Sequence, residues 1–362
     1  MIMTKQFDFG GRLASLYEKF FAEEIDALLI TKIPNVTYFS GFTGDSSALF
    51  IGRNFLKLIT DGRYTAQAIT QAKNFTLVEQ TEGLYKKIVD EIKLSGCKKI
   101  GFEGLFMTVA EHSYLKKELD GVEFKSVELD SLRQVKDAAE VNLIRTACEI
   151  ADDAFKKILE VIKPGVREVE IAAELEYFMR RFGSEKAAFT TIVASGWRGA
   201  LPHGVASEKK ICAGELITMD FGATYGGYCS DITRTICVGK ASNEQKKIYN
   251  AVLDAQLYGL EIITAGKGGK AIDAAVRERL TNAGYEKFFV HGLGHGVGLE
   301  IHEEPRLSKL SKCESLLPNM IVTDEPGIYI ENFGGVRIED TVLVTSGKAE
   351  ALTRSPKNFV EL

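Results

Sequence analysis

Short apolar runs alternate with amphipathic stretches over the first third of the chain. The apolar runs have the length of strands and fall at residues 27–30, 48–51 and 56–59, and residues 98–101 are a further strand candidate. Stretches with helical spacing fall at 13–24 and 66–72. A glycine-containing turn at 52–54 predicts a hairpin between the second and third runs. The pattern therefore predicts an α/β unit, and it contains no obvious nucleophile motif or phosphate-binding loop.

A mostly polar stretch at 128–136 separates this part from a long amphipathic helix. A chain of 362 residues is expected to form about two domains. We therefore predict an N-terminal domain at 1–133 and a C-terminal domain at 134–362.

The second part contains a weak internal repeat at an offset of 101 residues. The offset pairs Gly165 with Gly266 and Gly183 with Gly284, together with several apolar positions. Each copy has the pattern helix, glycine turn, helix and glycine stop, because glycine commonly ends a helix. Chance similarity between two pairs of amphipathic helices is the alternative explanation.

Each copy of the repeat continues into predicted strands. An apolar run at 189–194 in one copy corresponds to 288–290 in the other, and later strands at 214–220 and 319–325 each end on an acidic residue. The expected fold class is α/β (α+β), with two similar C-terminal halves packed face to face about a pseudo-twofold axis. Such packing would bring carboxylates from both halves to a central cleft.

Composition excludes several classes of function. The net charge of -5 and the pI near 5.8 argue against a nucleic-acid-binding protein, which normally has a basic face. No uninterrupted apolar stretch approaches ~18 residues, and the N-terminus has no signal-like run, so we expect no membrane span. Six cysteines without CxxC spacing are typical of reduced thiols, which favours a cytoplasmic location.

Five residues of the second part have the side chains of a metal site. They are Asp220, Asp231, His295, Glu325 and Glu339. Carboxylate oxygens can bridge two divalent ions, and four carboxylates roughly cancel the charge of the pair. Two such ions held about 3.5–4 Å apart activate a shared water for hydrolysis.

Histidines concentrate in the same region. His203, His291, His295 and His302 lie in or near glycine-rich loops, where the backbone can turn tightly and approach a ligand. A lone histidine is usually structural, but four in such loops beside acidic residues favour a functional site. For His291, a buried imidazole that only satisfies backbone groups is the alternative.

These segments resemble, in order, the motifs of the pita-bread metallopeptidases, the group that includes methionine aminopeptidase, aminopeptidase P and proline dipeptidase. The matching segments are Pro202 to Gly204, Met219 to Gly222, Tyr228 to Thr235, His291 to His302, Glu325 to Tyr329 and Gly334 to Asp340. Tyr38 to Gly44 and Thr60 to Tyr64 resemble the creatinase-like N-terminal domain of that group. The resemblance covers nearly the whole chain. The N-terminal domain favours the Xaa-Pro branch, because methionine aminopeptidases usually lack it.

The resemblance implies a dinuclear metal hydrolase. Asp220 would bind one ion, Asp231 and Glu339 would bridge both, and His295 and Glu325 would complete the other. A hydroxide shared by the ions would attack the carbonyl of the bond before proline. Glu325 would also shuttle a proton to the leaving nitrogen, or serve only as a ligand. Mostly oxygen ligation suits Mn²⁺, with Co²⁺ or Zn²⁺ as alternatives.

The resemblance also implies roles around the ions. His302 would hydrogen-bond the substrate carbonyl or oxyanion, His203 would contact the substrate backbone from the opposite wall, and His291 would shape the proline pocket. Arg337 would orient a ligand carboxylate, or form only a surface salt bridge. Arg306 would grip the free carboxylate of a dipeptide, or be a solvated loop arginine.

The expected protein is a cytoplasmic, homodimeric Xaa-Pro metallopeptidase. A proline dipeptidase acting on Xaa-Pro dipeptides is the preferred interpretation, and an aminopeptidase P acting on longer Xaa-Pro peptides is the near alternative. A metal-free creatinase-like hydrolase and a non-catalytic pita-bread binding module are further alternatives. The intact set of five candidate ligands counts against both.

Overall fold

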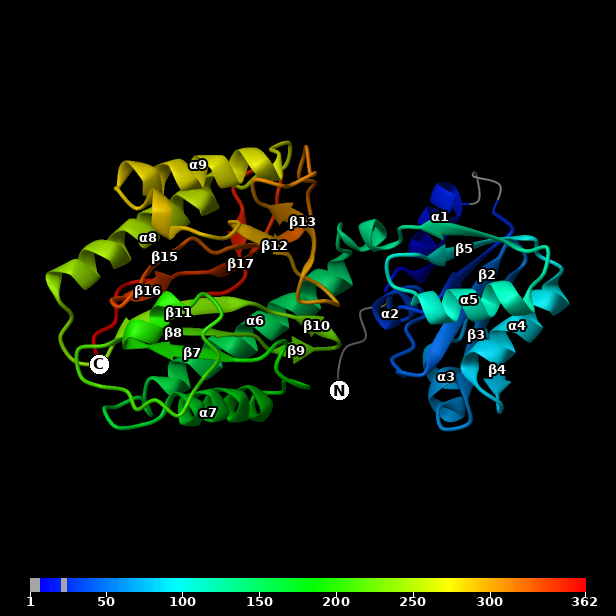
Figure 1. The fold of residues 1–362 in the computed structure, drawn as a ribbon, viewed down its shortest axis with the longest axis horizontal. Coiled ribbons are helices and arrows are strands. Elements are labelled where there is room, and N and C mark those ends of the chain that lie inside the picture. The colour runs from blue at the N-terminus through cyan, green and yellow to red at the C-terminus, as the bar shows by residue number, and fades with distance from the viewer. Residues whose placement is uncertain (1–6, 21–24) are drawn as a thin grey trace. The chain divides into compact units, whose positions relative to one another are not determined.

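The chain divides into two compact units, Met1–Arg133 and Gln134–Leu362, in a computed structural model that describes residues 7–20 and 25–362. Each unit has its own buried apolar core. Figure 1 shows each as sheets covered by helices.

The N-terminal unit is built on a six-stranded mixed sheet in the order β4-β3-β2-β1-β5-β6. Its strands are β1 (Ala27–Ile30), β2 (Ser47–Gly52), β3 (Phe55–Asp61), β4 (Thr76–Gln80), β5 (Lys99–Glu103) and β6 (Glu123–Val127). The predicted hairpin is confirmed, because β2 and β3 pair antiparallel with Gly52 opposite Phe55. The central strand β1 is buried along its whole length, as expected for a continuous apolar run.

Helices pack against this sheet. They are α1 (Phe9–Phe20), α2 (Ile33–Ser40), α3 (Thr65–Gln71), α4 (Leu84–Ser95) and α5 (Val109–Glu118), with a short 3-10 turn η2 (Asp130–Arg133) at the end of the unit. The predicted helix at 66–72 is confirmed by α3. The one predicted at 13–24 corresponds to α1, and its last four positions lie outside the described residues.

Two helix pairs dominate the C-terminal unit. They are α6 (Ala138–Ile158) with α7 (Glu168–Arg181), and α8 (Asn243–Ile262) with α9 (Gly269–Asn282). Helices α7 and α9 begin and end at the same offset of 101 residues. Before them lie Gly165 and Gly266, with φ of 92° and 90°, a conformation that glycine adopts without steric cost. No helix in the described ranges is both long and apolar enough to cross a membrane.

The strands of this unit lie between the helix pairs (Figure 1). Helices α6 and α7 share a core with the sheet β11-β8-β7, and α8 and α9 with the sheet β13-β12-β14-β17-β18. The first half contributes β7 (Ile192–Ser195), η3 (Gly196–Ala200), β8 (Leu216–Phe221), β9 (Thr224–Tyr225), β10 (Tyr228–Cys229) and β11 (Ile232–Cys237). The second contributes η4 (Glu286–Phe288), β12 (Gly294–Gly296), β13 (Glu303–Leu307), β14 (Ile321–Asp324), β15 (Gly327–Ile330), β16 (Gly334–Arg337), β17 (Asp340–Leu343) and β18 (Glu350–Ala351).

One predicted strand is wrong. Residues 288–290 form no strand, since the 3-10 turn η4 ends at Phe288 and the next strand is β12. Arg277 of α9 explains the irregular path, because its guanidinium donates to the carbonyls of Phe289 and His291, each at 2.7 Å. The corresponding run at 189–194 becomes a strand only from Ile192.

Candidate functional site

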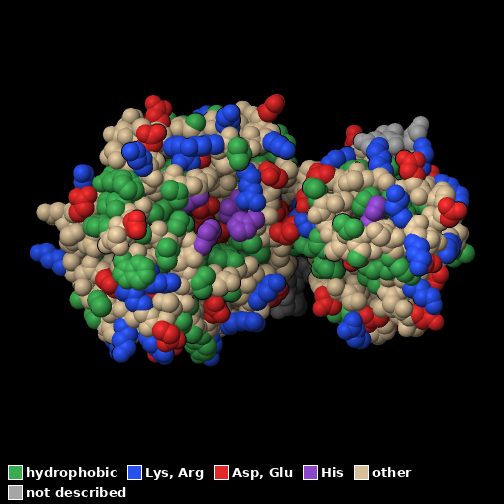
Figure 2. Space-filling view, viewed as in Figure 1, with side chains coloured by type: hydrophobic (Ala, Val, Ile, Leu, Met, Phe, Trp, Pro, Cys, Tyr) green, Lys and Arg blue, Asp and Glu red, His purple; other side chains and the backbone are tan. Residues whose placement is uncertain are grey.

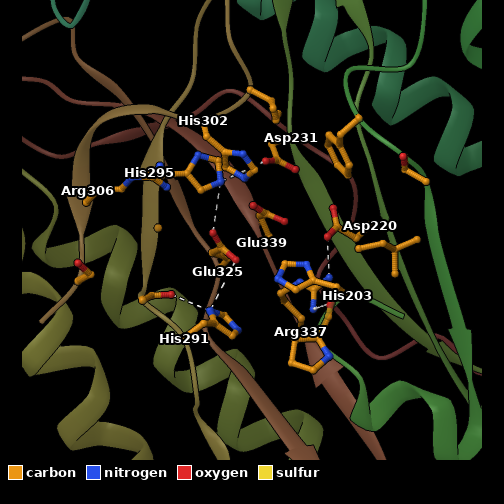
Figure 3. A pocket seen from close by; sticks show the side chains of 18 of the residues that line it. His203, Asp220, Asp231, His291, His295, His302, Arg306, Glu325, Arg337 and Glu339 are labelled. Carbon is orange, nitrogen blue, oxygen red and sulfur yellow. Dashed lines mark hydrogen bonds and ion pairs between the residues drawn. The ribbon is translucent and has the colours of Figure 1, made fainter. Parts of the chain in front are cut away.

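A cavity of about 840 Å³ opens between the two halves of the C-terminal unit. Figure 2 shows histidine side chains gathered in this hollow. Every side chain singled out in the sequence for metal binding, catalysis or substrate contact lines it. They are His203, Asp220, Asp231, His291, His295, His302, Arg306, Glu325, Arg337 and Glu339 (Figure 3).

Acidic side chains from both halves meet at the floor of the cavity. Asp231, His295 and Glu339 each place a ligand-type atom within 4.8 Å of the others. His295 Nε2 lies 3.5 Å from Asp231 Oδ2 and 3.5 Å from Glu325 Oε1. Asp220 Oδ1 is buried and accepts no hydrogen bond from any described residue. Carboxylate oxygens of this cluster therefore face a common space at the floor of the cavity.

The electrostatics of this cluster suit a cation. Burial, followed by repulsion from neighbouring carboxylates, raises the pKa of Asp231 and Glu339 well above their usual range. Burial also raises the pKa of Glu325 to about 8, with repulsion from Asp220 adding to it. Divalent cations would replace this repulsion by attraction and satisfy the unpartnered oxygen of Asp220. The donor set of four carboxylates and one imidazole thus fits divalent metal ions.

The backbone orients His295 for such a role. Its Nδ1 lies 3.0 Å from the Gly296 carbonyl oxygen, so Nδ1 carries the proton and Nε2 presents its lone pair to the acids. Burial lowers the pKa of His295 to about 3, which keeps the ring neutral. Thr323 supports the same segment, since its hydroxyl accepts from the His295 amide and donates to Glu325 Oε1.

Arg337 is buried in the cluster, which excludes the surface salt bridge that the sequence left open. Its Nη2 donates to Asp220 Oδ2 at 2.6 Å, and its Nε donates to the hydroxyl of Thr233. That hydroxyl donates in turn to Glu339 Oε2 at 2.6 Å. One guanidinium from the second half therefore orients a carboxylate of each half.

Tyr329 connects the same arginine to His291. Arg337 Nη1 can only donate, so it gives a proton to the Tyr329 oxygen at 2.8 Å. The Tyr329 proton then points to His291 Nε2 at 2.7 Å, and His291 Nδ1–H donates to the Gly292 carbonyl. Burial, and then the charge of Arg337, lowers the pKa of His291 to about 4. His291 is thus a neutral ring with one fixed tautomer.

Three side chains form the more open part of the cavity. The ring of His302 lies 4.4 Å from that of His295, edge to face. Burial, and then Arg306, lowers the pKa of His302, so the ring is neutral near pH 7. The Arg306 side chain is 44% exposed, with its Nε 4.0 Å from Glu304, and its guanidinium can still take a ligand. His203 is exposed on the opposite wall.

No role was predicted from the sequence for the supporting residues Thr233, Thr323 and Tyr329. Thr233 lies in β11, two positions after Asp231, so the alternation of side chains along an extended segment could have placed both on one face. The contact of Tyr329 with His291 spans 38 residues and had no local signal.

Comparison with known proteins identifies the family of this chain. The sequence pattern of metallopeptidase family M24 matches residues 142–346. The chain belongs to metallopeptidase family M24. The pattern of the creatinase/prolidase N-terminal domain matches residues 12–135. The predicted fold, a creatinase-like unit followed by a pita-bread unit, is therefore confirmed, and membership of the family implies a divalent-metal-dependent peptidase.

Individual members of the M24 family are similar over nearly their whole length. The peptidase YqhT of Bacillus subtilis (strain 168), itself uncharacterised, is 44% identical over 340 residues, 93% of this chain and 96% of that protein. The structure of an Xaa-Pro dipeptidase from Bacillus anthracis is 44% identical with a TM-score of 0.95, and the match covers 98% of this chain and all of that one. The structure of an X-Pro aminopeptidase from Thermotoga maritima MSB8 is 40% identical with a TM-score of 0.88, covering 94% and 98%.

Proposed function

We propose that this M24 peptidase is a proline dipeptidase, which hydrolyses the bond between the two residues of an Xaa-Pro dipeptide. The observation that carries the proposal is the presence of Arg306 in the same cavity as the acidic cluster. A guanidinium pairs with a carboxylate through two hydrogen bonds, so it selects a substrate whose carboxylate ends immediately after proline. The similarity to an Xaa-Pro dipeptidase supports this substrate class.

The proposal includes two divalent ions, with Mn²⁺ as the best fit to a mostly oxygen donor set. Asp220 would hold one ion, His295 and Glu325 the other, and Asp231 and Glu339 both. When bound, such ions lower the pKa of a shared water and polarise the carbonyl that it attacks.

The protein side chains then bind and orient the substrate. The neutral ring of His302 can donate a hydrogen bond to the scissile carbonyl oxygen, which gains negative charge during attack. Glu325 can hold a proton on its carboxylate and release it to the proline nitrogen as that atom leaves. His203 would contact the substrate backbone. His291, pinned by Tyr329, would form a rigid wall for the proline ring.

The test is a hydrolysis assay with Mn²⁺ on Ala-Pro, Ala-Pro-Ala and Ala-Ala side by side. Rapid cleavage of Ala-Pro, with Ala-Pro-Ala and Ala-Ala resistant, is the expected result. Cleavage of Ala-Pro-Ala in preference to Ala-Pro would establish aminopeptidase P activity instead, the second candidate, which the similarity to the Thermotoga maritima enzyme favours. No cleavage with Mn²⁺, Co²⁺ or Zn²⁺ would overturn both.

Two further expectations accompany the proposal. We infer a homodimer, which would sediment at about twice the chain mass of 39.9 kDa. We also infer a cytoplasmic location, in agreement with six cysteines that form no disulfide in the structure.

A further inference from the structure

A single loop, residues 195–207, positions His203 in the cavity. It begins at the end of β7, passes through η3 and contains Pro202-His203-Gly204. The His203 side chain is exposed, and no described side chain hydrogen-bonds to its imidazole. The position of the ring therefore depends on the conformation of the loop.

The first residue of α7, Glu168, holds both ends of this loop. Its side chain is fully buried. Oε1 accepts from the Ser195 amide at 2.7 Å and from the Ser195 hydroxyl at 2.8 Å. Oε2 accepts from the Ser207 amide at 3.1 Å and from the Ser207 hydroxyl at 2.7 Å. One carboxylate thus ties together two residues that are twelve positions apart.

A guanidinium extends this connection toward His203. Arg198 Nη1 donates to Glu168 Oε2, and Arg198 Nη2 donates to the Val205 carbonyl at 2.8 Å. The middle of the loop packs closely on β16, since a Cβ on Gly199 would lie 2.9 Å from the Gly335 amide nitrogen. Hydrogen bonds therefore hold the loop at both ends and at Val205, and close packing on β16 holds it at Gly199.

We propose that Glu168 is a positioning residue for His203, acting through the loop that it closes. This inference rests on the proposed function, in which His203 contacts the substrate. Every group that hydrogen-bonds to the Glu168 carboxylate is a donor. Two of these donors are the backbone amides of Ser195 and Ser207, which cannot act as acceptors. An uncharged amide in place of the carboxylate would turn its own N–H₂ toward one of these donors and open that side of the loop.

The second half of the unit contains a comparable pair behind His291. The buried Asp273 accepts from the Leu293 amide at 3.0 Å and pairs with Arg277. Arg277 donates to the His291 carbonyl. In both halves, a buried acid on the second helix of the pair fixes a histidine loop through an arginine. The pair in the second half serves as an internal control, because it holds a different histidine.

The decisive experiment is a double-mutant cycle on kcat and KM for Ala-Pro. Glu168→Gln is expected to lower kcat/KM between about tenfold and a hundredfold, because a displacement of about 1 Å misaligns a substrate contact. In a His203→Ala background, the same substitution should cost no more than about twofold, since the group it positions is already gone. In a His291→Ala background, the full loss should remain.

Matched variants separate this role from general destabilisation. Glu208→Gln neighbours the loop in sequence, but its side chain is 76% exposed, and it should leave kcat/KM unchanged. Ser207→Ala removes only one hydroxyl from Glu168 and should give a smaller loss in the same direction. It keeps the proposal testable if Glu168→Gln does not fold. Equal losses in the wild-type and His203→Ala backgrounds would overturn the proposal.

Hydrogen exchange tests the same idea without activity. In Glu168→Gln, amides of 195–207 should exchange faster, while those of 289–293 keep their protection. An unchanged loop, or a uniform loss of protection over the whole unit, would overturn the positioning role. Failure of the wild type to cleave any Xaa-Pro peptide would overturn the proposed function. The hydrogen-exchange result would still test whether Glu168 fixes the loop.

Discussion

The two halves of the C-terminal unit share a scaffold but carry different chemistry. Each half has a helix pair, the second helices α7 and α9 share one offset, and the glycines before them have the same backbone conformation. The first half supplies Asp220, Asp231 and His203 to the cavity. The second half supplies all the other ionisable groups, including the imidazole of His295 and both arginines. Repetition of the fold therefore does not require repetition of the site.

The difference follows from where each half places its side chains. In each half, the acids lie in or beside the ends of antiparallel strands, as with Asp220 in β8 and Glu325 after β14. The glycine-rich segment 291–298 of the second half carries both His291 and His295, whereas the loop 195–207 of the first half supplies His203 alone. The scaffold thus brings acids from both halves together, and one loop makes the site asymmetric.

The largest expected effect comes from removing one shared carboxylate of either half. Asp231→Asn and Glu339→Gln should each lower kcat/KM at least about a thousandfold, because each would remove a carboxylate that we propose holds both ions. Metal per chain, measured by mass spectrometry, should fall, while circular dichroism stays native. Asp254→Asn, whose side chain is 64% exposed, is the control. Full activity in either variant would remove the idea that both halves build one metal site.

A smaller effect should distinguish the histidines of the two halves. His302→Ala should lower kcat by about a hundredfold to a thousandfold, since it removes a hydrogen bond that strengthens as charge develops on the carbonyl oxygen. His203→Ala should act more weakly and mainly through KM. Steady-state kinetics with metal content as the check would measure both. Equal effects of the two substitutions on kcat would show that His302 and His203 do not differ in their chemical roles.

Arg306 tests whether the second half also sets substrate length. Arg306→Ala should raise KM for Ala-Pro by about tenfold, because a charge-assisted pair with the terminal carboxylate is lost. KM for Ala-Pro-amide, which has no carboxylate, should stay within about twofold of the wild-type value. Lys309→Ala, on an exposed neighbouring position, is the matched control. The same KM increase for both substrates would contradict a carboxylate clamp.

The smallest effect concerns the pH dependence of stability without metal. Glu325 has its pKa raised from 4.5 to about 8, so in this range the folded protein keeps a proton that the unfolded chain has lost. Its contribution to stability therefore falls as pH rises. Below 6.5 the effect is opposed by His291 and His295, whose pKa values are lowered from 6.5 to about 4 and about 3. The clear window is pH 6.5 to 8, where the decrease from Glu325 should be on the order of 2 kcal/mol.

Urea unfolding of chelator-treated protein at both ends of this window would measure that decrease. Glu325→Gln should reduce the slope, and Asp231 and Glu339, whose pKa values are also raised, should account for the remainder of the slope. Added Mn²⁺ should reverse it, because protons compete with the metal for the same oxygens. A slope of zero in the metal-free wild type would contradict the repulsion argument.

Local sequence patterns predicted much of this architecture because they report short-range physics. Hydrophobic runs located β1 and the β2–β3 hairpin, and the spaced glycines located α7 and α9. Placing acids and histidines beside strands and glycine-rich turns singled out the side chains that line the cavity. The failure at 288–290 has a tertiary cause, since Arg277 binds the carbonyls that a strand would have used.

By itself, the sequence determined the elements, the repeat and the types of side chain available for chemistry, because helix and strand periodicity and glycine turns act over a few residues. Only the tertiary structure decided which groups meet. Arg337 reaches Asp220 across 117 positions, and Glu168 reaches Ser207 across 39. The first contact depends on how the two halves pack, and the second on how α7 packs beside β7 within one half. Burial in that packing then raises the pKa of Asp231, Glu325 and Glu339 and lowers that of His291 and His295, and so decides how the site can work.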